Sequence, residues 1–169
     1  MSVVAYALLA IGTAQEHEHE WPACDSYVAA LEWSMSHARY CMVVARHIVI
    51  AEHDDDVRAL LEQVVLHTYP FATIASVADG VAALGTFRQQ GAKLVLIDAE
   101  LPLQTGLDVV RELRSYDATV PIIVLSVDDT VAEQAHSIGA TCFVAKPFGM
   151  REMMQTLLEV LPLEQAHEG

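Results

Sequence analysis

The chain has 169 residues, of which 53% are hydrophobic and 19% are charged. This length suits one domain with a sizeable core plus an appendage, and the composition excludes a mainly disordered chain. A formal net charge of −14 argues against direct binding to nucleic acid or to an anionic membrane. The three cysteines form neither a metal motif nor an even disulfide set, which indicates a reducing, cytoplasmic setting.

Residues 1–45 are expected to form an N-terminal extension of unknown role. Residues 3–11 are apolar, but a membrane span needs roughly 20 such residues, and no Lys or Arg precedes them as in a secretory leader. His and Glu alternate over residues 16–20, where a solvated charged turn is favoured over a metal site. Apolar spacings of three and four over residues 26–42 predict an amphipathic helix, which docks on the domain or pairs weakly in a homodimer.

A change of pattern at residue 46 predicts a domain over residues 46–162, followed by a short polar tail over 163–169. Within this domain, strand and helix patterns alternate five times. The expected strands cover residues 48–50, 71–77, 94–97, 122–125 and 141–145. The apolar positions expected on the core faces of the helices include Leu60, Val81, Met150 and Leu158. Five consecutive βα units predict a parallel sheet with helices on both faces and right-handed crossovers.

The stretch from Lys93 to Gly106 is the most informative part of the domain. Its four apolar residues, 94–97, end at Asp98, and such a run is typical of a strand buried on both faces. Asp98 is therefore expected as a solvent-facing residue at the C-terminal end of the strand, where open α/β sheets bind ligands. Pro102 and Gly106 then interrupt the chain before the next helix.

Polar side chains follow the other predicted strands in the same way. The residues at these strand ends are Glu52, His53, Asp54, Asp98, Ser126 and Lys146. Each one alone would be an ordinary polar residue at a strand end, but parallel strands bring all of them to one edge of the sheet. Clustered carboxylates favour Mg²⁺, and a hydroxyl and an ammonium beside the ion suit the oxygens of a phosphoryl group.

From about residue 47 to 161 the chain resembles the receiver domain of two-component response regulators. The matching pieces are residues 48–52 before an acidic turn, 98–102 with Gly106, 121–126, 139–140, and Phe143 followed by 146–148. The resemblance implies a flavodoxin-like α/β fold, doubly wound, with strand order 2-1-3-4-5. It also implies a stand-alone receiver in a bacterial phosphorelay, because no output domain is recognised in the sequence.

The same resemblance implies the chemistry. Asp98 would be the phosphoacceptor, which takes a phosphoryl group from a sensor histidine kinase or a histidine phosphotransfer protein. Glu52, Asp98 and the backbone carbonyl of Glu100 would hold Mg²⁺.

Further roles follow from the resemblance at the last strands. Lys146 would pair with Asp98 at rest and with the phosphoryl group afterwards, while Ser126 would bond a phosphoryl oxygen. Phe143 would swing inward and so switch a surface that binds a downstream protein partner. The peptide bond between Lys146 and Pro147 would be cis.

His53 departs from the family pattern, because receivers usually carry a second acidic Mg²⁺ ligand at this position. Imidazole is a poor ligand for Mg²⁺, so metal binding should be weaker. Either the ring points to solvent, or the surrounding carboxylates favour a protonated ring that supplies part of the missing positive charge. Asp54 could approach the metal instead, so the choice between His53 and Asp54 stays open.

Three functions are compatible with these patterns. The first is the phosphoryl-accepting switch, which is not an enzyme acting on external substrates. The second is a pseudo-receiver, a binding module that keeps the fold but signals without phosphate because of His53. The third is a phosphohydrolase with an Asp nucleophile, which the absence of a lid-sized insertion disfavours.

Overall fold

The computed structural model describes residues 46–163, which form a five-stranded parallel sheet with the order β2-β1-β3-β4-β5. The strands are β1 (His47–Ala51), β2 (Thr73–Val77), β3 (Leu94–Asp98), β4 (Ile122–Ser126) and β5 (Cys142–Ala145). The predicted α/β fold with strand order 2-1-3-4-5 is therefore confirmed. β1 lies in the interior of the sheet, because the chain adds β2 on one side of it and then crosses to add β3 on the other side. This change in the winding direction creates a switch point between β1 and β3.

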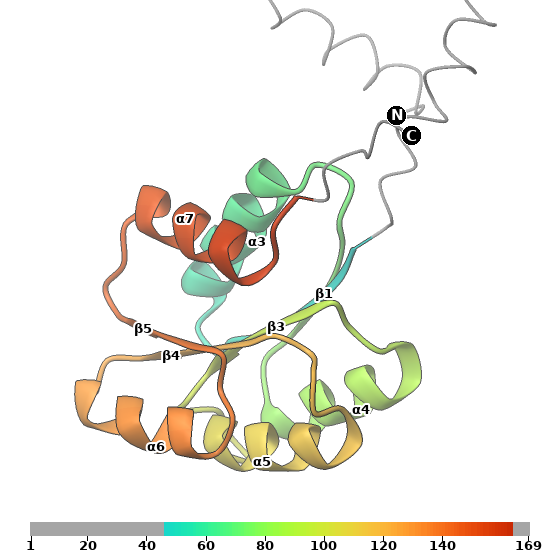
Figure 1. The fold of residues 1–169 in the computed structure, drawn as a ribbon, viewed down its shortest axis with the longest axis vertical. Helices are drawn as coiled ribbons and strands as arrows, with labels where there is room; N and C mark the ends of the chain where they lie inside the picture. The colour runs from blue at the N-terminus through green and yellow to red at the C-terminus, as the bar shows by residue number, and fades with distance from the viewer. Residues whose placement is uncertain (1–45, 164–169) are drawn as a thin grey trace, which may run out of the picture. The chain divides into compact units, whose positions relative to one another are not determined.

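Helices cover both faces of the sheet (Figure 1). On one face lie α3 (Asp55–Thr68) and α7 (Met150–Val160), which pack side by side. On the other face lie α4 (Gly80–Gln90), α5 (Gly106–Tyr116) and the short α6 (Ala132–Ser137), which follows a 3₁₀ turn at Asp129–Val131. Each helix from α3 to α6 joins two parallel strands, and α7 follows the last strand, as the alternating pattern of the sequence predicted.

The core consists of two apolar clusters, one on each face of the sheet. On β1, Ile48 and Ile50 join the cluster under α3 and α7, whereas Val49 and Ala51 join the cluster under α4, α5 and α6. The residues of β3 and β4 alternate in the same way, and all of them are buried. Because both faces are covered, these strands are apolar at nearly every position instead of alternating with polar residues.

Polar side chains set the beginnings of three helices near the carboxyl ends of the strands. Asp54 accepts hydrogen bonds from two N–H groups in the first turn of α3. Asp79 and Thr105 each accept one in the first turns of α4 and α5. Such caps satisfy N–H groups that have no partner within the helix, so they determine where each connection turns back over the sheet.

Some predicted boundaries and helix faces are wrong in detail. The strand predicted from residue 71 begins at Thr73, because the N–H of Ala72 donates to the carbonyl of Tyr69 and closes a turn before it. Four apolar positions predicted to face the core are exposed by about one third to just over one half of their surface: Leu60, Val81, Met150 and Leu158. The buried stripe of each helix is narrower than its apolar stripe, since one sheet covers only part of a helix surface.

The predicted extension over residues 1–45, its helix over 26–42 and residues 164–169 of the tail lie outside the described residues. The domain boundary at residue 46 therefore stays a prediction. Within residues 46–163, no helix is both long enough and apolar enough to cross a membrane.

Candidate functional site

The strand ends bring the predicted polar side chains to one edge of the sheet. The pairing of β1 with β3 sets Ala51 level with Ile97, and Glu52 and Asp98 directly follow these two residues. β4 ends at Ser126, and the N–H of Lys146 donates to the carbonyl of Ser126 at 2.7 Å. These residues surround the end of β3, where ligands bind in sheets of this topology.

Glu52 and Asp98 are both buried, with 0% and 2% of their surfaces exposed, and each shares its two oxygens between His53 and Lys146. The Nδ1 of His53 lies 2.8 Å from Asp98 Oδ2 and 3.3 Å from Glu52 Oε1. The Nζ of Lys146 lies 2.6 Å from Glu52 Oε2 and 3.3 Å from Asp98 Oδ1. Two buried carboxylates need hydrogen-bond donors and positive charge, and these two side chains supply them.

The expectation about Asp98 needs correction, whereas the predicted pairing of Lys146 with Asp98 is present but incomplete. Asp98 is not solvent-facing, because His53, Lys146 and the N–H of Glu100, 3.2 Å from Asp98 Oδ1, surround its carboxylate. The shortest contact of Lys146 is with Glu52, and its contact with Asp98 is 0.7 Å longer (3.3 against 2.6 Å). The ammonium therefore bridges both acids at rest.

Asp54 serves the helix and not the carboxylate pair. Its Oδ1 accepts the N–H groups of Asp56 and Val57 at 2.9 and 3.0 Å, and the N–H of Val57 is the main cause that lowers the pKa of Asp54. The backbone N–H of Asp54 donates to Glu52 Oε1 at 3.0 Å. Of the two residues left open by the sequence, His53 is the one whose side chain faces Asp98.

His53 is neither buried nor turned fully to solvent. About half of its side chain (48%) is exposed, while Nδ1 contacts both carboxylates. An ionised carboxylate only accepts hydrogen bonds, so the tautomer that fits this contact carries its proton on Nδ1. The interpretation in which the ring merely points to solvent is wrong for this structure.

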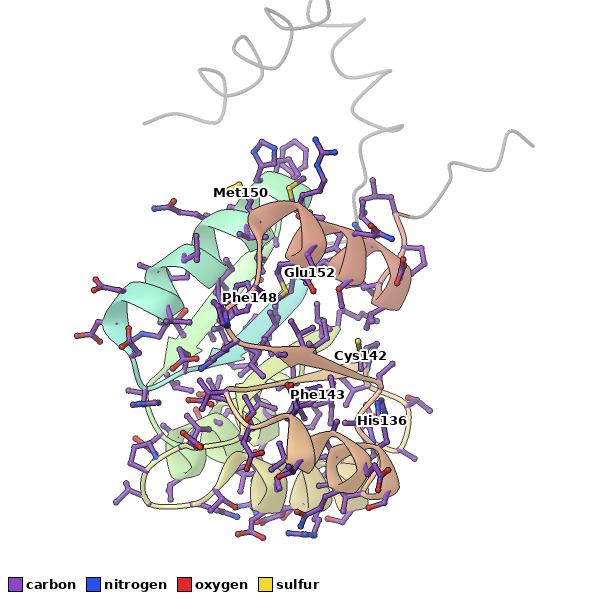
Figure 2. The ribbon with its side chains drawn as sticks, turned by 90° about the vertical axis from the view of Figure 1, so that its left-hand side faces the viewer. His136, Cys142, Phe143, Phe148, Met150 and Glu152 are labelled. Carbon is purple, nitrogen blue, oxygen red and sulfur yellow. The ribbon has the colours of Figure 1, made fainter. Side chains whose placement is uncertain are left out.

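Ser126, predicted to bond a phosphoryl oxygen, ends β4, and Phe143, the predicted switch residue, lies on the neighbouring strand β5. Ser126 is buried, and its hydroxyl accepts the N–H of Asp128 at 2.9 Å. Phe143 is partly buried against the cluster under α4, α5 and α6, on the side of β5 that faces α6 (Figure 2). The peptide bond between Lys146 and Pro147 is cis, as predicted.

The sequence reasoning missed Arg58, which holds the backbone beneath the carboxylates. Its Nη1 donates to the carbonyl of Glu52 at 2.8 Å, and its guanidinium pairs with Asp55 on the same helix. The spacing of three between these two residues indicated the ion pair but gave no sign of the bond to Glu52.

The donor atoms of the site converge closely enough for one metal ion. One oxygen of Glu52, one oxygen of Asp98 and the Nδ1 of His53 all lie within 4.8 Å of one another. The two carboxylates fit Mg²⁺, which prefers oxygen ligands. His53 does not, because its N–H lies between the oxygens that would bind the ion. Its half-exposed ring can leave this position without opening the core.

Residues 48–158 match the family described as the response regulator receiver domain. The uncharacterized transcriptional regulatory protein YkoG of Bacillus subtilis is 31% identical over 117 residues, which are 68% of this chain and 50% of the relative. The alkaline phosphatase synthesis transcriptional regulatory protein SphR of Synechococcus elongatus is 36% identical over 121 residues, 65% of this chain and 46% of the relative. The chain thus spans about half the length of these curated relatives, and the stand-alone form stays a prediction.

Solved structures agree on the fold. The chemotaxis response regulator CheY4 of Vibrio cholerae superimposes with a TM-score of 0.64 at 21% identity, covering 70% of this chain and 100% of that one. The BeF₃-activated DrrB receiver domain superimposes with a TM-score of 0.63 at 18% identity, covering 70% of this chain and 98% of that one. The family match, together with the buried acid at the end of β3, leads to one conclusion: the chain belongs to the response regulator receiver family.

Proposed function

We propose that Asp98 accepts a phosphoryl group from a sensor histidine kinase or a histidine phosphotransfer protein, and that the modified domain switches a protein-binding surface. The observation that carries this proposal is the position of Asp98. Its carboxylate ends β3 at the switch point of the sheet, buried beside a second acid and a lysine. Nucleophilic carboxylates act from such enclosed positions, where the surrounding charges are fixed in advance.

In the proposed reaction, an oxygen of Asp98 attacks the phosphorus of phosphohistidine, the P–N bond breaks, and the donor's imidazole leaves. Lys146, within 3.3 Å of Asp98, supplies positive charge for the phosphoryl oxygens. The hydroxyl of Ser126 now accepts a bond from Asp128, and its own proton is available to donate to a phosphoryl oxygen.

Glu52, Asp98 and the carbonyl of Glu100 are the groups that would hold Mg²⁺, which when bound neutralises charge on the transferring phosphoryl group. For this, the His53 ring has to turn away from the two oxygens that it now contacts. The position of the His53 ring thus determines how readily the site binds Mg²⁺.

The switch follows from the added charge. A phosphoryl group brings about −1.5 to −2 charges to a site whose carboxylates already occupy Lys146. Lys146 would move toward the phosphoryl group, and Ser126 would follow. Phe143, only partly buried, has room to repack inward and to change the surface of β5 for a downstream protein partner. We place this exchange in the cytoplasm and propose a switch, not an enzyme with external substrates.

The test is incubation with acetyl phosphate and Mg²⁺, followed by mass spectrometry of the intact chain and of its peptides. We expect one added phosphoryl group, located at Asp98 and lost at alkaline pH as an acyl phosphate. Asp98→Asn, which keeps the shape of the side chain, should stay unmodified. Lys146→Ala should still be labelled in part but should not change the environment of Phe143, followed by its NMR resonances. Labelling of Asp98→Asn at the wild-type rate would refute the assignment.

A pseudo-receiver is the second candidate, favoured by one observation: His53 Nδ1 fills the space between the two carboxylates, 2.8 Å from Asp98. In that case wild type would stay unlabelled at saturating Mg²⁺, whereas His53→Asp would restore labelling.

A further inference from the structure

We propose that His53 converts the acidic receiver site into a mixed nitrogen and oxygen site, which prefers a borderline first-row transition ion such as Mn²⁺ or Co²⁺ over Mg²⁺. The three protein donors would be Nδ1 of His53, Oδ2 of Asp98 and Oε1 of Glu52. The inference deepens the proposed function because it concerns the ion that serves the same site.

The distances between the donors support this assignment. Nδ1 lies 2.8 Å from Asp98 Oδ2 and 3.3 Å from Glu52 Oε1. With metal–ligand bonds of about 2.1 Å, neighbouring ligands lie about 3.0 Å apart in an octahedron and about 3.4 Å apart in a tetrahedron. Nδ1 is therefore already spaced from each carboxylate oxygen like a neighbouring ligand, and all three donors lie within 4.8 Å of one another.

The ion would not have to displace the Lys146 ammonium from the carboxylate oxygens that it contacts. This ammonium binds the other oxygen of each carboxylate, Glu52 Oε2 and Asp98 Oδ1. Oε1 of Glu52 is held in place by the N–H of Asp54 at 3.0 Å. The three proposed ligand atoms are consequently not the oxygens that Lys146 contacts, so metal binding would leave the lysine in place beside Asp98.

The chemistry of the donors decides which ion is preferred. Mg²⁺ gains little from imidazole, whereas imidazole binds transition ions well and with an affinity that rises from Mn²⁺ to Co²⁺. To bind the ion, Nδ1 has to present its lone pair, so the Nδ1 proton leaves to solvent and the neutral ring carries its single hydrogen on Nε2. His53 therefore turns from a competitor of the metal into one of its ligands.

The test measures metal binding without any phosphodonor, on the full chain. Calorimetry gives the affinities for Mn²⁺ and for Mg²⁺, and pulsed EPR of bound Mn²⁺ detects nuclear modulation from a coordinated nitrogen. The background chain carries His17→Asn and His19→Asn, because the alternating His and Glu residues of the extension could bind the same ions. In this background His53 is compared with His53→Asn, which stays neutral, and with His53→Asp, which restores the acid.

We expect nitrogen modulation from Mn²⁺ in the parent and its loss in both variants. The ratio of Mn²⁺ to Mg²⁺ affinity should fall by at least about tenfold in His53→Asp, mainly because Mg²⁺ binds more tightly. Two results would overturn the inference: the same ratio in all three proteins, or Mn²⁺ bound by the parent without nitrogen modulation. No Mn²⁺ binding until His53 is replaced would also overturn it, since His53 would then only block the site.

These outcomes are separable from those of the proposed function. If acetyl phosphate with Mg²⁺ labels Asp98 but the imidazole has no role in metal binding, the proposed function stands and this inference fails. Metal preference through His53 in a chain whose Asp98 is never labelled would do the reverse.

Discussion

The loop between β3 and α5 offers a sharp test of how tightly the backbone holds Asp98, the proposed phosphoacceptor. Gly106 begins α5, and its N–H donates to the carbonyl of Ala99 at 3.0 Å. A Cβ at this position would lie 2.0 Å from the carbonyl oxygen of Asp98 and 3.0 Å from the Cα of Ala99. Both neighbours are backbone atoms, so no side-chain rotation can relieve the overlap. Gly106→Ala must therefore push α5 away from the end of β3.

The size of the effect follows from this overlap. Ordinary contacts to a Cβ begin near 3.4 Å, so the backbone has to shift by more than 1 Å at a strand whose residues are all buried. Overpacking of this kind costs about 1–3 kcal/mol and sometimes more, and we expect about 3 kcal/mol because the clash is with backbone. For a domain of this size, that corresponds to a fall in Tm of roughly 10 °C.

Urea unfolding followed by circular dichroism measures this change, with Gly85→Ala as the matched control. Gly85 lies inside α4, and a Cβ there meets nothing within 4 Å. The same substitution should therefore stabilise the domain by about 0.5–1 kcal/mol, through helix propensity. If Gly106→Ala lowers the free energy of unfolding by less than about 1 kcal/mol at an unchanged m-value, the loop relaxes freely and the reasoning is wrong.

Two further predictions concern the fold. The hydroxyl of Tyr69 donates to the carbonyls of Leu157 and Leu161, so Tyr69→Phe should lose about 1–2 kcal/mol of unfolding free energy in urea titrations. Burial raises the pKa of Tyr69 from 10.0 to about 12, so its contribution is complete below pH 10 and is lost as the pH rises towards 12. Tyr69→Phe should lack this alkaline loss, and equal pH profiles of the two proteins would contradict it. A chain that begins at Met42 should keep the stability of the full chain in thermal unfolding, because residues 46–163 by themselves build an apolar cluster on each face of the sheet. A fall of more than about 2 kcal/mol would refute this.

The sequence alone was sufficient for the fold and for most of the polar residues that meet at this edge of the sheet, although it gave no sign of Arg58. Apolar runs ending in polar residues predicted five parallel strands, because burial on both faces leaves a signature that is local in the chain. Asp98, Glu52 and Lys146 could be named for the same reason, since each directly follows such a run. The order of the strands came from the resemblance to receivers and not from the pattern itself.

Tertiary structure alone decided how these side chains meet. The burial of Asp98, the bridge from Lys146 to Glu52 and the ring of His53 between two carboxylates depend on strands far apart in sequence. The exposure of Val81 likewise depends on how much of a helix the sheet can cover. Local patterns record which residues avoid water, whereas the charges around a group and its access to solvent arise only when distant segments pack together.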